Sequence, residues 1–178
     1  NIKEIKIHNI KYAGNFTLPA TSTESGTWAL TPIPADKDGK KINTFTVVTD
    51  QNITVTNTVT DISSKTPMLN APQTLTAWDV TTAKTKEQAD AVDPAESYLE
   101  ITCKIKQAGV YVFGSESAYK TLYVPFGTEW QIGKRHIYTL IFGGGYDDHG
   151  QPILKPINFD AEVEPWDENA INNSKIDM

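Results

Sequence analysis

The stretch Tyr98–Lys106, with the sequence YLEITCKIK, decides the class of fold. Its apolar and polar residues alternate: Leu99, Ile101, Cys103 and Ile105 are separated by Glu100, Thr102 and Lys104. Successive side chains of an extended strand point to opposite faces of a sheet. The alternation therefore predicts one strand whose first set of side chains lies in the core and whose second set faces outward. A shift of one residue in register would exchange the two sets.

The same period of two recurs along the chain, in stretches rich in Thr, Val, Ile and aromatic residues, which suit a pleated, half-buried surface. These stretches are 5–7, 42–48, 52–59, 74–80, 110–113, 118–124, 136–142 and 157–163. Turn signals separate them, and Gln107–Gly109 is predicted to connect two strands of a hairpin. Many short strands between turns predict an all-β fold, a sandwich or a barrel.

One segment departs from this pattern. Ala83–Val92 (AKTKEQADAV) contains good helix formers, and Asp93-Pro94 would end a helix there. We expect a short helix or a surface loop insertion over 83–92. The remaining chain is expected to form one domain over residues 1–166, followed by a polar, poorly ordered tail over 167–178.

Composition excludes several classes of function. Hydrophobic residues make up 39% and charged residues 21% of the 178 residues, which is typical of a globular chain. The net charge is −6 and Arg135 is the sole arginine, so the chain lacks the basic surface and the bidentate donors that nucleic-acid binding uses. No nucleic-acid partner is therefore expected, and no apolar run approaches the ~20 residues of a membrane-spanning helix.

Three polar motifs have both a chemical and a structural interpretation. Gly143–Gly145 follows a strand, but no lysine and no helix follow it as a phosphate-binding loop requires, so a hairpin tip is favoured. Asp147, Asp148 and His149 could bind a divalent metal, and Asp36–Gly39 has part of a calcium-loop spacing, but neither has the number of oxygen ligands that a calcium site takes. Turns capped by aspartate side chains explain both.

The remaining reactive residues are also interpreted structurally. Cys103 is expected to be a buried small apolar residue, and His136 an exposed or edge residue of a strand. The tryptophans, which are expected to pack in the core although they could also stack on sugars, are Trp28, Trp78, Trp130 and Trp166. We therefore predict no catalytic, cofactor-binding or metal-binding residues, no cofactor, and no enzymatic activity.

The C-terminal part of the chain resembles the fimbrillin family of Bacteroidales, the type V pilins. The resemblance rests on the segments Pro67–Leu75, Tyr98–Ile101, Tyr123–Phe126, Trp130 with Gly133-Lys134, Tyr138–Leu140, Ile157–Phe159 and Val163–Trp166, in that order. It covers residues 65–166. Before residue 65 it rests on Ile5–Ile7, Gly14–Phe16 and Gly26–Trp28 alone.

The resemblance implies a transthyretin-like β-sandwich, and the length of the chain fits the C-terminal one of the family's two domains. It also implies a structural or adhesive subunit of a cell-surface fimbria on the outer membrane of a Gram-negative bacterium, anchored through lipid in its full-length form. Its partners would be other fimbrial subunits, joined by strand addition, and ligands on host or bacterial surfaces. The alternative from a different class is a glycan-binding module on a similar β-sandwich.

Overall fold

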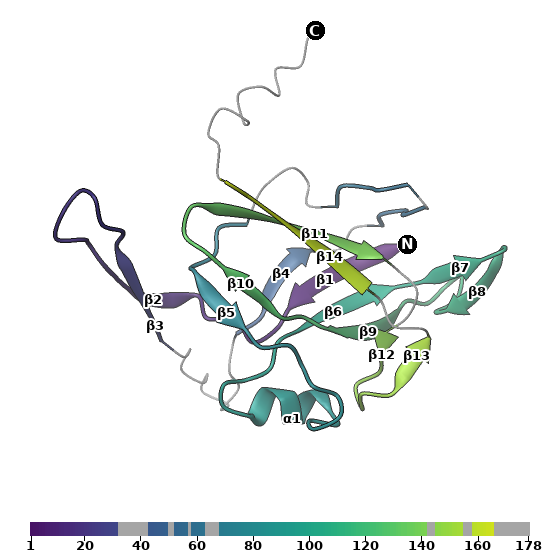
Figure 1. The fold of residues 1–178 in the computed structure, drawn as a ribbon. Helices are drawn as coiled ribbons and strands as arrows, with labels where there is room; N and C mark the ends of the chain where they lie inside the picture. Colours follow the sequence, from purple (N-terminus) through teal and green to yellow (C-terminus); the bar gives the residue numbers. More distant parts are fainter. Residues whose placement is uncertain are drawn as a thin grey trace, which may run out of the picture.

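The computed structural model describes residues 1–31, 43–49, 52–56, 58–62, 68–141, 145–154 and 158–165. These residues form an all-β fold (Figure 1), as the alternating pattern predicts. Several predictions lie outside the described residues: the turn 35–39, Gly143 and Gly144, Trp166, and the tail 167–178. The assignment of residues 1–166 to one domain stays a prediction.

The largest sheet has six strands. Their order across the sheet is β13 (Pro152–Leu154), β12 (Gly145–Tyr146), β9 (Lys120–Pro125), β6 (Tyr98–Cys103), β1 (Ile2–Ile7) and β4 (Phe45–Val48). All neighbouring strands in it are antiparallel. The first part of the alternating stretch Tyr98–Lys106, residues 98–103, is thus a central strand that is paired on both sides.

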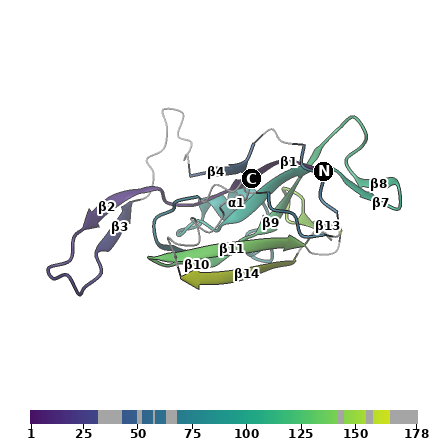
Figure 2. The same cartoon turned by 90° about the horizontal axis from the view of Figure 1, so that it is seen from above.

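Four strand pairs accompany this sheet. They are β5 (Gln73–Leu75) with β10 (Thr128–Trp130), β11 (Lys134–Ile141) with β14 (Asn158–Pro165), β2 (Ala13–Thr17) with β3 (Thr27–Thr31), and β7 (Ile105–Gln107) with β8 (Val110–Phe113). Figure 2 shows β10, β11 and β14 as a layer facing β1, β6 and β9. The β2–β3 and β7–β8 hairpins project from opposite ends of the molecule (Figures 1 and 2).

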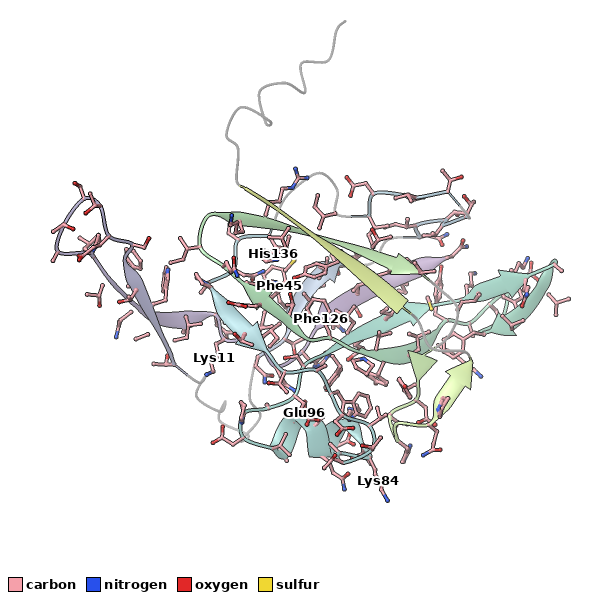
Figure 3. All side chains as sticks on the ribbon, in the orientation of Figure 1. Lys11, Phe45, Lys84, Glu96, Phe126 and His136 are labelled. Atoms are coloured by element: carbon pink, nitrogen blue, oxygen red, sulfur yellow. The ribbon has the colours of Figure 1, made fainter. Side chains whose placement is uncertain are left out.

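The space between the two layers holds the main core. Its buried residues come from β1, β4, β6 and β9, from β5 and β10, from Phe113 of β8, and from Ile10 and Phe126, which follow β1 and β9. Tyr138 and Leu140 of β11 pack against this core. In Figure 3, Phe126 and Phe45 lie in this interior. Phe126 is 1% exposed and stacks edge-on against Tyr138 with 5.0 Å between ring centroids. Burial of this apolar surface is what holds the layers together.

Strand β6 confirms the predicted orientation. Leu99, Ile101 and Cys103 are buried in the core, whereas Glu100 and Thr102 are partly exposed. The chain leaves the sheet after Cys103, so the last predicted inward residue falls on β7, where it is partly buried against the same core.

A second, smaller cluster covers the outer face of the six-stranded sheet. It contains Trp78, Ala83, Ala89 and Tyr98, with Tyr123 packed against it. Ala89 belongs to helix α1 (Lys86–Ala91), which lies within the predicted stretch 83–92. Thr85 caps its N-terminus by accepting a hydrogen bond from the Gln88 amide, as threonine commonly does. The sheet is therefore buried on both faces around Tyr98.

The stretch 52–59 is a wrong strand prediction. Among its described residues, Ile53 forms one isolated bridge with Ile2, and no strand is present. Two threonines make local bonds instead: the Thr56 hydroxyl accepts from the Thr58 amide at 3.3 Å, and the Thr60 hydroxyl donates to the Thr58 carbonyl at 3.1 Å. Such side-chain bonds compete with the ladder of a sheet.

Strands β2, β3, β10, β12 and β13 are not predicted from the sequence. The predicted strand 74–80 is also too long, because β5 ends at Leu75. Ala77 then forms an isolated bridge with Ser97, and Trp78 enters the second cluster. Tertiary packing has overridden local pattern there.

Candidate functional site

The β2–β3 hairpin carries an apolar face that no other described element packs against extensively. Phe16 is paired directly with Trp28, and Gly14 with Leu30. Strand alternation places one set of side chains on the same side of the hairpin. We call this set the apolar hairpin face: Tyr12, Phe16, Leu18, Trp28 and Leu30. The opposite side carries small or polar residues: Ala13, Asn15, Thr17, Thr27, Ala29 and Thr31.

Most of this face is open to solvent. The exposed fractions are 54% for Tyr12, 45% for Phe16, 78% for Leu18 and 43% for Trp28. The Phe16 and Trp28 rings are 5.1 Å apart and inclined at 46°. Phe16 also lies across Gly26, where an added Cβ would come within 2.1 Å of its ring, so the glycine makes room for the aromatic side chain. The result is a continuous apolar surface outside the core.

Two properties make this hairpin a candidate interaction surface. Glu24 is the one charged residue between Tyr12 and Thr31, so the apolar face is electrically neutral. An isolated two-stranded hairpin is at best marginally stable in water, and contiguous exposed apolar patches mark contact sites. A hairpin of this kind gains stability when a partner covers its apolar face.

A cluster of lysines and tyrosines lies at the base of the other projecting hairpin. We call it the lysine–tyrosine cluster: Lys3, Lys104, Lys106, Tyr111 and Tyr119. Lys104 Nζ is 4.8 Å from the Tyr119 ring centroid and 6.0 Å from that of Tyr111, and Lys106 Nζ is 4.5 Å from Tyr111. Lys3 Nζ is 5.9 Å from the Tyr119 ring centroid. Ring faces attract cations at these distances.

A polar network runs along the outer face of β1 and β6. His8 Nε2 lies 2.8 Å from Glu100 Oε2, and His8 Nδ1 lies 3.2 Å from the Thr44 hydroxyl. The hydrogen bond from His8 lowers the pKa of Glu100 below its usual value, assisted by the charge of Lys6 and opposed by burial. Lys6 in turn bonds Glu4 at 2.7 Å, and this bond is the main cause that raises the pKa of Lys6.

Thr44, His8 and Glu100 have the order of a hydroxyl–histidine–carboxylate triad, and they lie on the outer face of the sheet. The His8 ring is stacked on Tyr98 with 4.6 Å between centroids. These contacts form a hydrogen-bonded network that joins the loop before β4 to β6 through the His8 side chain.

The turn at Asp147 behaves as the sequence predicts. One carboxylate oxygen of Asp147 accepts hydrogen bonds from the amides of His149 and Gln151, both at 2.9 Å. His149 Nδ1 lies 2.7 Å from Asp148 Oδ1. The three side chains could offer three ligand atoms within 4.8 Å, but Asp148 and His149 are exposed and bond each other. An aspartate-capped turn accounts for these contacts.

The other predicted residues divide between the core and the surface. Cys103 is buried, and burial raises the pKa of its thiol to about 11. His136 is partly buried, with Nε2 accepting from the Gln131 amide at 3.4 Å. Trp78 and Trp130 lie in the two clusters as predicted, whereas the core prediction for Trp28 is wrong. The alternation of Tyr12, Phe16 and Leu18 is a sequence signal for a strand there, but it does not show that the apolar side is exposed.

Two surface depressions lie beside residues already described. One of about 130 Å³ lies between the loop after β1 and the segment after helix α1, where the Asn9 side chain donates to Asp90 Oδ1 at 2.6 Å and to the Glu96 carbonyl at 2.7 Å. The other belongs to the lysine–tyrosine cluster. Neither is a deep cleft with convergent carboxylates.

Comparisons with protein-family models, curated proteins and solved structures return no match. Within the described ranges, no helix has the length and apolar character needed to cross a membrane.

Proposed function

We propose that this chain is a structural or adhesive subunit of a bacterial cell-surface fimbria that is not an enzyme and assembles with other subunits by strand addition. The observation that carries the proposal is the exposed apolar hairpin face. The proposal includes the transthyretin-like form of the β-sandwich, a position at the outer membrane, and a lipid anchor in the full-length protein. The family resemblance of residues 65–166 supports these features.

The size of the apolar hairpin face indicates what kind of contact it makes. Aromatic side chains bury about 150–250 Å² each, so five partly exposed side chains supply on the order of 400 Å². A standard interface buries about 800 Å² on each partner. Side-chain burial alone is therefore too small for stable assembly, and a second source of pairing is needed.

Open strand edges supply that source. In the part of the chain that the structure describes, β2 and β3 pair with each other alone, so each has an edge of unpaired backbone groups. A strand from another subunit can add its main-chain hydrogen bonds at such an edge while its side chains contact the apolar face. Strand addition thus uses both the open strand edges of the hairpin and its apolar face.

A glycan-binding module remains the alternative, and one measurement weighs against it. Aromatic side chains that stack on a sugar chain favour a common plane, whereas the Phe16 and Trp28 rings are inclined at 46°. An irregular apolar surface suits the side chains of a protein better than the flat face of a sugar ring.

The test compares the two sides of the hairpin. We expect Phe16→Ser combined with Trp28→Ser to abolish incorporation into fimbriae on the cell surface, with the melting temperature of the body unchanged. The matched control, Thr17→Ser combined with Ala29→Ser, alters the opposite side and should incorporate normally. Normal incorporation of the first variant would disprove the assembly role, and loss of binding on a neutral-glycan array instead would favour the alternative.

A further inference from the structure

We propose that the lysine–tyrosine cluster binds the anionic groups of an acidic polysaccharide. This inference deepens the proposed function, because it names the chemical class of ligand for an adhesive subunit, and it rests on that function for its biological setting. The contacts that form the lysine–tyrosine cluster do not involve the apolar hairpin face.

The chain brings the cluster together from three places. Lys3 stands at an irregularity of β1, because the pairing with β6 shifts register between Ile2 and Glu4. Such bulges redirect a side chain. Lys104 lies where the chain leaves β6 for β7, and Lys106 is the cross-strand partner of Tyr111. The pairing of β1 with β6 and of β7 with β8 therefore fixes the backbone positions from which these lysines and Tyr111 extend.

A tight turn places Tyr119 against Lys104. The Ser115 amide donates to the Ala118 carbonyl at 2.8 Å, and the Ala118 amide donates to the Ser115 hydroxyl at 3.0 Å. Gly114 precedes this turn at φ +73°, and an added Cβ there would lie 2.9 Å from Lys104 Cβ. The Tyr119 hydroxyl is held in turn by Asn52 Oδ1 at 2.8 Å. The tyrosine ring is thus positioned before any ligand arrives.

The ammonium groups of Lys104 and Lys106 keep an uncompensated positive charge. Lys104 Nζ donates to the Glu116 carbonyl at 3.0 Å, and its other partners are neutral rings. Among the described residues, neither lysine forms an ion pair with a carboxylate. A ring holds a cation without neutralising it. Restrained side chains also lose less conformational freedom when an anion binds.

The shape of the cluster favours a chain of spaced anions over one small ion. The depression is partly open to solvent and has four lining residues, Asn1, Lys104, Lys106 and Tyr111, so a single small anion in it would stay in contact with water. Ammonium groups act as point charges, without the bidentate geometry that selects one phosphate or carboxylate. Two of them side by side, on Lys104 and Lys106, match repeated sulfate or carboxylate groups, whose attraction adds along the chain.

Two other classes of partner, nucleic acid and protein, fit the lysine–tyrosine cluster less well. Nucleic acid would meet a chain of net charge −6 with a single arginine. A protein partner draws most of its binding energy from apolar anchors. The exposed valines of this hairpin, Val110 and Val112, lie on the side opposite Tyr111 by strand alternation. The cluster offers charge and hydroxyl groups without such anchors.

The experiment is binding of the purified chain to two polyanions by calorimetry. A heparin-derived oligosaccharide carries sulfate groups, and an oligogalacturonate carries carboxylates alone, so the two arms identify the anionic group. We expect at least one to bind, with dextran not binding, and binding to vanish toward about 1 M salt, where the screening length is about 3 Å. Binding of neither oligosaccharide would overturn the proposal.

Matched variants locate the site. Lys104→Gln with Lys106→Gln should weaken binding about tenfold, the effect of two exposed ion pairs. The control, Lys11→Gln with Lys84→Gln, removes the same charge from exposed positions away from the β7–β8 hairpin (Figure 3). Equal weakening in both variants would show a general charge effect and overturn the site. Equal affinity for duplex DNA, or self-association lost in the first variant, would overturn the choice of polysaccharide. Fimbrial incorporation of the same variant, expected to be normal, separates this result from the test of assembly.

Discussion

Trp130 donates its indole N–H to the Tyr138 hydroxyl at 2.8 Å, and this bond joins β10 to β11 across the second layer. The Tyr138 hydroxyl also lies 2.7 Å from the Thr128 hydroxyl. Strands β5–β10 and β11–β14 are separate pairs in their backbone hydrogen bonding. Side chains around Tyr138 therefore connect what the backbone leaves separate.

The first prediction concerns this connection. Tyr138→Phe leaves the largely buried indole N–H of Trp130 without that partner, so we expect a loss of about 1–3 kcal/mol in the free energy of unfolding. Trp130→Ala removes the ring as well and should cost about 3–5 kcal/mol. Urea unfolding followed by circular dichroism measures both. A Tyr138→Phe protein as stable as the unaltered chain would show that the bond contributes nothing.

The second prediction concerns acid stability. Glu100 has a pKa below its usual value in the folded chain, mainly through His8, so ionised Glu100 stabilises the fold. That contribution is present above the pKa of the unfolded state and is lost as the pH falls through the folded-state pKa. Glu100→Gln should therefore destabilise the fold at neutral pH and make little difference in strong acid.

Urea unfolding at several pH values tests this. The exposed Glu129→Gln is the control and should change stability little at any pH. An effect of Glu100→Gln that grows toward acid would have the wrong sign and would contradict the role of ionised Glu100.

The third prediction concerns Cys103. Its side chain is 1% exposed and burial raises its thiol pKa to about 11, so the reactive thiolate is both inaccessible and scarce at neutral pH. A bulky disulfide reagent should react slowly with the native chain and rapidly in denaturant. A cysteine introduced by Ser117→Cys, at an exposed position, should react at once. Equal rates for Cys103 and the introduced cysteine in the folded protein would show that β6 is not in the described register.

The fourth prediction compares two glycines at positive φ. Gly109, at φ +83°, has open space around an added Cβ, so Gly109→Ala should cost about 1–2 kcal/mol for its backbone conformation alone. Gly114→Ala adds a contact of 2.8 Å with the Ala118 carbonyl and should cost more. Thermal unfolding of the two variants gives the comparison, and a smaller loss for Gly114→Ala would contradict the packing of this turn.

The sequence predicted the central part of the fold because burial and pattern agree there. Strand β6 is paired on both sides and covered on one face by the main core, so its alternation is strict at Leu99, Ile101 and Cys103. Helix α1 was predictable for a similar reason, since good helix formers end at Asp93-Pro94. Local preference and tertiary packing support the same structure in both segments.

The apolar hairpin face and the lysine–tyrosine cluster were harder to predict, for opposite reasons. Trp28 of the hairpin face was expected in the core because an apolar side chain in a strand does not show whether anything covers that side. Trp28 shows this, since it has the pattern of a buried residue and is 43% exposed. The lysine–tyrosine cluster depends on a turn that brings Tyr119 back to Lys104, 15 residues away. No local period encodes such a contact.

The isolation of the β2–β3 hairpin also has a practical consequence. Its connecting loop, residues 18–26, lies at the far end of two strands that project from the layered body (Figure 1). The entropy cost of a longer loop rises slowly, by about 0.6 kcal/mol for each doubling of its length. A foreign peptide grafted into this loop leaves the packing between the layers untouched. The hairpin tip is accordingly the position in the described chain where an antigenic epitope can be displayed on an intact scaffold.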